Sequence, residues 1–146
     1  MLLPVTLTVA ALAGLGNLAL ATRIVQLRFA RQVLFGDGGD ARLTARTRSH
    51  ANFAEYAPFV LILMALIEAG GGRASALAAA GAIFVIGRIV HAIGMEKATA
   101  NPWRAAGALA TWIVLLGLAI WGLALAATSA RRPVAPGVPV ELVPSA

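Results

Sequence analysis

Four long apolar segments, separated by polar links, constrain this chain more than any other feature of its sequence. They cover about residues 2–21, 48–70, 74–95 and 105–127. A helix needs about 20 predominantly apolar residues to cross the hydrocarbon core of a bilayer. Lipid offers no partners for free backbone groups, so segments of this kind must be helical. The sequence therefore predicts an all-α membrane protein, built as a four-transmembrane-helix bundle.

The composition supports this fold class and excludes several kinds of site. Hydrophobic residues make up 60% of the 146 residues and charged residues only 12%, about half the share usual in soluble domains. The chain has no Cys, which excludes disulfides and thiolate nucleophiles, and its two His make a metal centre unexpected. Residues 1–128 are thus predicted to form the transmembrane domain. Residues 129–146 hold four of the seven prolines and are predicted to be a disordered tail.

The distribution of basic residues predicts the orientation in the membrane. No Lys or Arg precedes Arg23, which favours a retained first helix over a signal peptide. By the positive-inside rule, the more basic connections face the cytoplasm, which places both termini outside. Three basic residues lie on the side of the termini (Arg73, Arg131 and Arg132), and nine lie on the other side: Arg23, Arg28, Arg31, Arg42, Arg46, Arg48, Arg88, Lys97 and Arg104.

The second apolar segment opens with a polar stripe. Arg48, Asn52 and Glu55 are spaced i, i+4 and i+7, which places a cation, an amide and a carboxylate on one narrow face of a helix. Pro58 follows and frees the backbone carbonyl of Ala54, which can soften the helix there. Polar groups at membrane depth are expensive and are candidates for function.

Two further segments bring polar residues to the same end of the bundle. Arg88 and His91 are spaced i, i+3 near the end of the third segment, and Arg104 comes just before the fourth. Several arginines and one carboxylate suit an anionic ligand that also carries an ammonium group. Glutathione has this pattern of charges, and a guanidinium beside its thiol would raise the thiolate fraction.

Each of these residues also has a purely structural interpretation. Arg48 can extend its charge to the lipid headgroups. Glu55 can form an intramembrane ion pair with Arg48 or Arg88. His91 can be a packing residue with a satisfied ring, and Arg104 can be a solvated loop residue. The functional interpretation depends on all of them together.

The motif Arg48-x-His50-x-Asn52-x-x-Glu55-x-x-Pro58, with Arg88-x-x-His91 and Arg104, resembles the signatures of the MAPEG superfamily of membrane proteins in eicosanoid and glutathione metabolism. The resemblance covers roughly residues 3–127 and is strongest to the small bacterial branch. It implies a homotrimer in the bacterial inner membrane, with glutathione as cosubstrate bound between subunits near the cytoplasmic face. It implies that Arg104 stabilises the thiolate. It implies a glutathione-binding set of Arg48, Asn52, Glu55, Arg88, His91 and Arg28.

Two positions depart from the pattern of the eicosanoid-forming members. Met95 stands where several of them have a tyrosine, and Ala105 where some have a serine. The first functional hypothesis is a glutathione-dependent membrane transferase or peroxidase that acts on lipophilic electrophiles. The alternatives are a non-catalytic protein of the same fold that binds lipid or glutathione, and a small transporter. Four helices without broken repeats make the transporter the weakest of the three.

Overall fold

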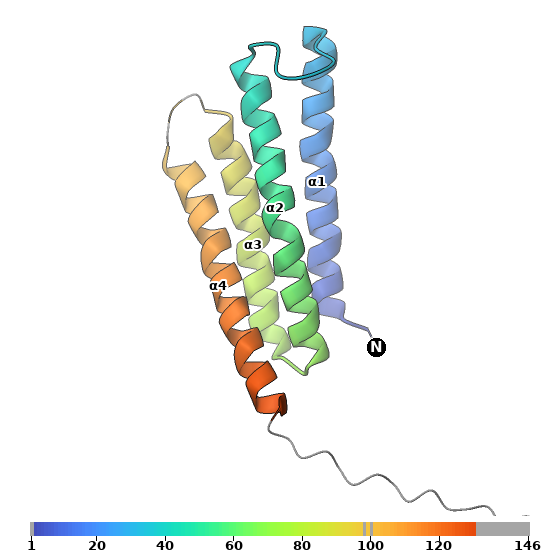
Figure 1. The fold of residues 1–146 in the computed structure, drawn as a ribbon, viewed down its shortest axis with the longest axis vertical. Coiled ribbons are helices and arrows are strands. Elements are labelled where there is room, and N and C mark those ends of the chain that lie inside the picture. Colours follow the sequence, from blue (N-terminus) through green and yellow to red (C-terminus); the bar gives the residue numbers. More distant parts are fainter. Residues whose placement is uncertain (1, 98, 100, 131–146) are drawn as a thin grey trace, which may run out of the picture.

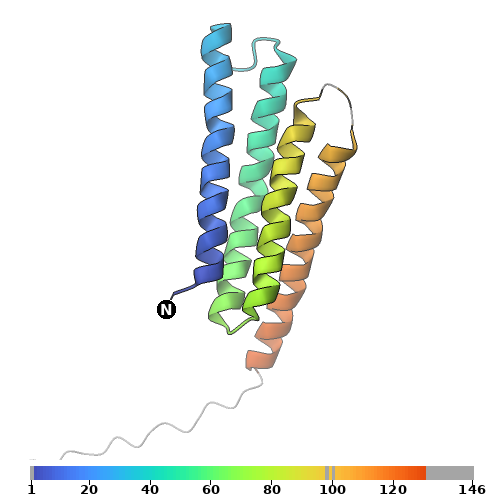
Figure 2. The same cartoon turned by 180° about the vertical axis from the view of Figure 1, so that it is seen from behind.

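The chain folds into four antiparallel helices in a computed structural model, which describes residues 2–97, 99 and 101–130. The helices are α1 (Pro4–Arg31), α2 (Ala41–Ala69), α3 (Ala74–Met95) and α4 (Pro102–Ala130). Each is long and apolar enough to cross a membrane. The α1–α2 loop and the α3–α4 link lie at one end of the bundle, and the N-terminus and the end of α4 lie at the other (Figures 1 and 2). The predicted all-α architecture with four spans is confirmed.

Helices α1 and α2 continue well beyond the apolar segments. Residues 22–31 and 41–47, which lie between the first two predicted spans, are helical, so only residues 32–40 form the loop. Polarity does not end a helix, and Arg, Gln and Leu have good helix propensity. The basic side chains of this region are therefore held on rigid helix ends. Of the predicted tail, residues 131–146 lie outside the described residues.

The loop between α1 and α2 turns through three glycines with positive φ: Gly36, Gly38 and Gly39. The side chain of Asp40 then caps α2, because its Oδ1 accepts hydrogen bonds from the backbone amides of Arg42 (2.8 Å) and Leu43 (3.1 Å). These bonds, led by that from Leu43, and the nearby charge of Arg31 hold the pKa of Asp40 below its usual value. The capped loop fixes where α2 starts.

At the opposite end, the first turn of α1 is capped from a distant part of the chain. The carboxylate of Glu68, near the end of α2, accepts hydrogen bonds from the backbone amides of Val5 (3.0 Å) and Thr6 (2.7 Å). A helix N-terminus carries free amides and a partial positive charge, which a carboxylate neutralises. Glu68 thereby ties the ends of α1 and α2 together.

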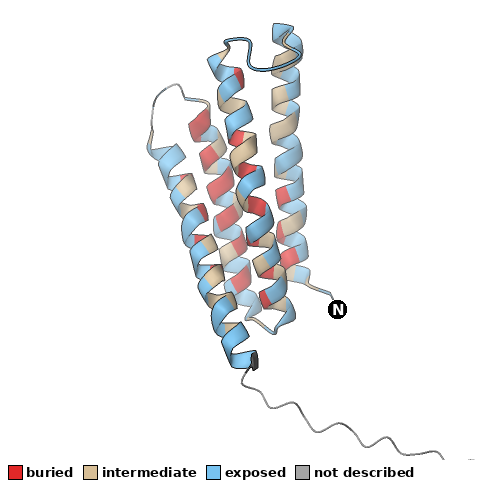
Figure 3. Cartoon of the chain, viewed as in Figure 1, coloured by how far each residue is buried: buried red, intermediate tan, exposed pale blue. Residues whose placement is uncertain are grey.

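The buried residues face the centre of the bundle and the outward faces are exposed (Figure 3). Large apolar side chains with less than 2% of their surface exposed fill the centre, and they include Phe84, Met64, Leu77 and Val60. The outward faces are apolar as well: Leu7, for example, has 62% of its surface exposed. An apolar surface of this extent fits contact with lipid and with other membrane helices.

Helices α3 and α4 approach so closely that their backbones touch. A Cβ atom at Gly107 of α4 would lie 2.5 Å from the carbonyl oxygen of Gly87 and 2.6 Å from the backbone nitrogen of His91. A Cβ atom at Gly94 would collide with the backbone of Arg104. Small residues permit such approach in membrane bundles. Gly87 and Gly107 act in this way, whereas Gly117 has no atom of another helix within 4 Å of its Cβ position.

Candidate functional site

The polar stripe of α2 lies at the surface of the single protomer. Arg48 and Glu55 are exposed and Asn52 is half-buried. Within the described part of the chain, the carboxylates of Asp37, Asp40, Glu68 and Glu96 all accept hydrogen bonds, whereas Glu55 has no hydrogen bond or ion pair. The ion pair of Glu55 with Arg48 or Arg88, which was the structural interpretation, is therefore not formed within one protomer.

Asn52 links this stripe to the interior. The Nη1 atom of Arg88 donates a hydrogen bond to Oδ1 of Asn52 (2.9 Å) and lies 3.4 Å from the backbone oxygen of the same residue. Only 5% of the surface of Arg88 is exposed. Because Oδ1 is occupied, the amide orientation of Asn52 is set and its NH₂ group is the end left for a ligand.

His91 connects α3 to the first turn of α4. The side chain is buried, and its Nδ1 lies 3.1 Å from the backbone oxygen of Arg104. A carbonyl oxygen only accepts, so Nδ1 carries the proton in this contact. The amide of Arg104 donates to Oδ1 of Asn101 (3.1 Å), which caps α4. The backbone of Arg104 is thus held on both sides while its side chain is exposed.

Arg28 lies near the end of α1 and contacts the α1–α2 loop. Its Nη1 atom donates to the backbone oxygen of Leu34 (3.2 Å), which ties the end of α1 to the loop. Arg28 and Arg48 line a hollow of about 310 Å³ together with Asp37 and Thr44. In one protomer the predicted site residues therefore form three groups: Arg28 near Arg48, Asn52 with Arg88, and His91 with Arg104. Glu55 stands apart from all three.

A cluster of charges beside these groups is not evident from the sequence. Glu96, directly after α3, lies 2.6 Å from Nη2 of Arg23, 3.5 Å from Nε of Arg42 and 3.1 Å from Nε of Arg46. Burial raises the pKa of Glu96, but the hydrogen bond from Arg46 and the charges of the three arginines outweigh burial and hold this pKa below its usual value. Glu96 therefore joins α1, α2 and α3 at this end.

We expect Glu96→Gln to lower the free energy of unfolding by about 1–2 kcal/mol at neutral pH, because it leaves Arg46 without its charged partner. The folded-state pKa of Glu96 lies below the ordinary 4.5, so its contribution is complete above that pH and is lost as the pH falls through the folded value. Thermal unfolding in detergent should separate the variant from the native protein at pH 7, and the difference should shrink as the pH is lowered below 4.5. Lys97→Gln is the control, and an equal loss in that variant would contradict the role of Glu96.

Comparison with known proteins identifies the family to which this four-helix protein belongs. The family model of MAPEG matches residues 6–124. The chain belongs to the MAPEG family. Its curated relatives include the inner membrane protein YecN of Escherichia coli K12, which is 34% identical over 93 residues, or 64% of this chain and 70% of the relative. YecN of E. coli O6:H1 matches to the same extent.

Family membership confirms the resemblance that the α2 motif indicated and explains the four apolar helices. The protein is an integral membrane protein of the bacterial inner membrane. Membership of the MAPEG family makes a glutathione-related function in the membrane the first candidate for this protein. The described residues contain no group of three or more His, Cys, Asp or Glu that could hold a metal ion.

Proposed function

We propose that this MAPEG protein is a glutathione-dependent transferase or peroxidase for lipophilic electrophiles, with glutathione bound between the subunits of a homotrimer near the cytoplasmic face. The observation that carries the proposal is the exposed carboxylate of Glu55 on α2, which has no partner among the described residues. A carboxylate at membrane depth without a partner is costly, so Glu55 needs a cation from outside its own protomer. The ammonium group of glutathione is such a cation.

The rest of the stripe complements the other end of the same ligand. Arg48 is exposed on the face that carries Glu55, and its guanidinium can take a glutathione carboxylate through two parallel hydrogen bonds. Asn52, oriented by Arg88, can donate from its NH₂ group to a carbonyl or carboxylate oxygen of the peptide. Opposite charges along one helix face would hold a zwitterionic peptide lengthwise.

Arg104 supplies the group that would activate the thiol. Its side chain is exposed in the first turn of α4, where the helix dipole adds positive potential. A guanidinium beside the sulfur lowers the thiol pKa and raises the thiolate fraction. In the transferase reaction the thiolate forms a carbon–sulfur bond, the leaving group departs with its electron pair, and the thiol proton goes to solvent. A peroxidase reaction would oxidise two glutathione thiols to one disulfide while it reduces a lipid hydroperoxide to an alcohol and water.

A non-catalytic binding protein is the second candidate, and two positions favour it. Met95 is buried and Ala105 has only a methyl group, so neither provides a polar contact beside Arg104. In this case the α2 stripe would still bind glutathione, but no conjugate would form. Binding and turnover therefore have to be measured separately.

The proposal is tested by thermal unfolding of the purified protein in an uncharged detergent as the glutathione concentration is raised. Bound glutathione should stabilise the protein by about 2.7 kcal/mol at a hundredfold excess over Kd. Glu55→Ala should abolish most of this gain, whereas Arg73→Ala, at the other end of the bundle, should retain it. Formation of a conjugate with a generic aromatic electrophile separates the transferase from the binding protein. The absence of both stabilisation and conjugation would reject the transferase and the glutathione-binding protein alike.

A further inference from the structure

The first turn of α4, which carries Arg104, lies directly against the last turns of α3. Gly94 of α3 is buried, and a Cβ atom added there would lie 2.7 Å from Cα and 2.9 Å from Cβ of Arg104. Three residues earlier on α3, Nδ1 of the buried His91 donates to the backbone oxygen of Arg104 (3.1 Å). Both contacts involve the backbone of Arg104, so α3 determines where this residue lies.

The side chain of Asn101 joins the two helices. Its Oδ1 accepts from the backbone amide of Arg104 (3.1 Å), and its Nδ2 donates to the backbone oxygen of Gly94 (2.9 Å). Nδ2 also lies 3.0 Å from the backbone oxygen of Thr99. Pro102 begins α4, and a proline in this place has no amide that needs a partner. A primary amide can accept and donate at the same time, so Asn101 caps α4 and also attaches it to the end of α3.

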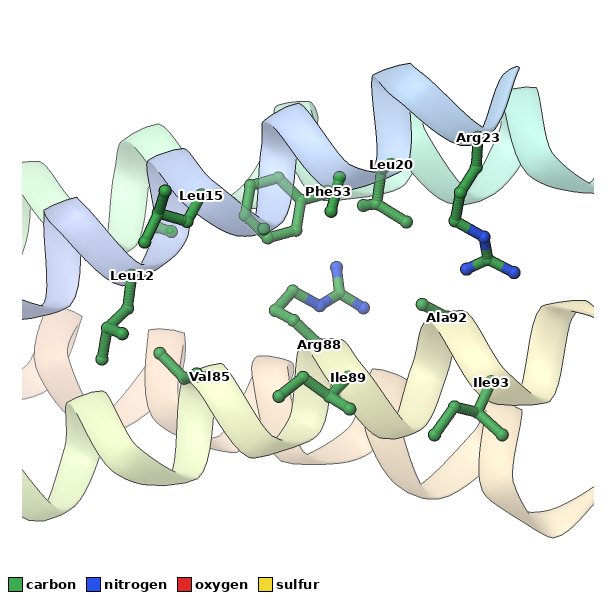
Figure 4. Close-up of a pocket in the computed structure, with 13 residues that line it drawn as sticks. Leu12, Leu15, Leu20, Arg23, Phe53, Val85, Arg88, Ile89, Ala92 and Ile93 are labelled. Atoms are coloured by element: carbon green, nitrogen blue, oxygen red, sulfur yellow. The ribbon is translucent and has the colours of Figure 1, made fainter. Parts of the chain in front are cut away.

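Arg104 is the charge that α4 contributes to this end of the bundle, since the sequence of Pro102–Ala130 contains no other charged residue. The arginine of α3 serves a different part of the protein. Arg88 points from α3 toward α1 (Figure 4), and its Nη1 donates to Oδ1 of Asn52 (2.9 Å). A thiol that is activated from α4 therefore depends on Arg104, and Arg104 depends on how the first turn of α4 is held.

The distance between the guanidinium and the thiol is set through α3. The stripe that would bind the peptide is on α2, whereas Arg104 is on α4, and α4 packs more extensively against α3 than against α2. The attraction between a guanidinium and a thiolate falls as their separation grows. A misplacement of about 1 Å in a reacting complex can cost a large factor in rate. A contact that fixes α4 on α3 can therefore influence the reaction without touching the peptide.

We propose that Asn101 is a positioning residue for Arg104: it joins the carbonyl of Gly94 to the amide of Arg104 and so holds the guanidinium where it stabilises the thiolate. The catalytic part of this inference rests on the proposed function, and the attachment of α4 to α3 does not. Loss of the Asn101 side chain should lower kcat and move the pH profile to higher pH, because the bound thiol ionises later. The KM for glutathione should change little, because the binding stripe is on α2.

Steady-state conjugation by the full-length protein in an uncharged detergent tests the catalytic part. Asn101→Ala should lower kcat by about 3- to 10-fold, and it should cause no further loss in an Arg104→Ala background if it acts through Arg104. The hydroxyl in Asn101→Ser can still cap α4 but is too short to reach Gly94 as well, so this variant should recover the melting temperature and not kcat. Recovery of kcat by Asn101→Ser, or a full further loss in the Arg104→Ala background, would overturn the proposal.

Amide hydrogen exchange, resolved by NMR, tests the attachment without any substrate. The amide of Arg104 should exchange at least about tenfold faster in Asn101→Ala than in the native protein, because its acceptor is removed. Thr99→Ala is the control, since Thr99 accepts from Asn101 through its backbone oxygen, and it should match the native protein in exchange and in kcat. Unchanged exchange in Asn101→Ala would overturn the attachment. A native protein that forms no conjugate would instead reject the proposed function and the catalytic part of this inference, whatever the exchange result.

Discussion

Replacing Gly107 with Val should cost at least about 3 kcal/mol of folding free energy and separate α4 from α3. A Cβ atom at this position would lie 2.5 Å from the oxygen of Gly87 and 2.7 Å from Cβ of His91. The colliding atoms include backbone, so no rotamer change can relieve the contact. Thermal unfolding in detergent, or limited proteolysis of the α3–α4 link, measures the loss.

Gly117→Val is the matched control for this substitution. Gly117 is on the same helix, and its Cβ position has no atom of another helix within 4 Å in the protomer. The substitution is chemically the same, so its effect should remain within about 0.5 kcal/mol. Equal destabilisation by the two variants would show that the folding free energy does not depend on the close α3–α4 contact.

Replacing Arg104 with Ala should reduce the rate of conjugation at saturating glutathione by about 10- to 100-fold. This prediction rests on the proposed function. Loss of one to two pKa units of thiolate stabilisation corresponds to about 1.4–3 kcal/mol. The activity of the variant should also shift to higher pH, because its bound thiol ionises later. Steady-state rates as a function of pH measure both effects.

The fold of the Arg104 variant should be unaffected. The contacts that hold this residue involve its backbone, namely the hydrogen bonds with His91 and Asn101, and its side chain is exposed. The melting temperature without glutathione should therefore match that of the native protein. Arg104→Lys, which keeps the charge and loses the planar fork, should recover part of the rate. An unchanged rate in Arg104→Ala would remove Arg104 from the chemistry.

The helices themselves could be predicted because each property that defines them is local in the sequence. Apolar length predicted the four spans. The extension of α1 and α2 could not be read from hydropathy, since the helix ends carry polar residues that favour a helix as much as a loop. Glu68 and Glu96 could not be recognised either, because the partners of Glu68 lie at least 62 residues away and those of Glu96 at least 50.

The candidate site was predictable along one helix and not across helices. The spacing of Arg48, Asn52 and Glu55 is enough to place them on one face of α2. The hydrogen bond from Arg88 to Asn52 depends on the register between α2 and α3, which core packing sets. The same register leaves Glu55 without an ion pair among the described residues, although the sequence alone equally allowed a pair with Arg48 or Arg88. The sequence feature that could have drawn attention to Glu55 is the scarcity of acidic residues, since the chain has only six.

The central claim is that Glu55 receives the ammonium group of glutathione. Equilibrium binding of glutathione and of N-acetylglutathione, which lacks that charge, tests the claim on the native protein and on Glu55→Gln. The native protein should bind glutathione at least about tenfold more tightly, as expected for a charged hydrogen bond, and Glu55→Gln should bind both peptides equally. A native protein that binds the two peptides equally, or a variant that keeps the full preference, would contradict the account.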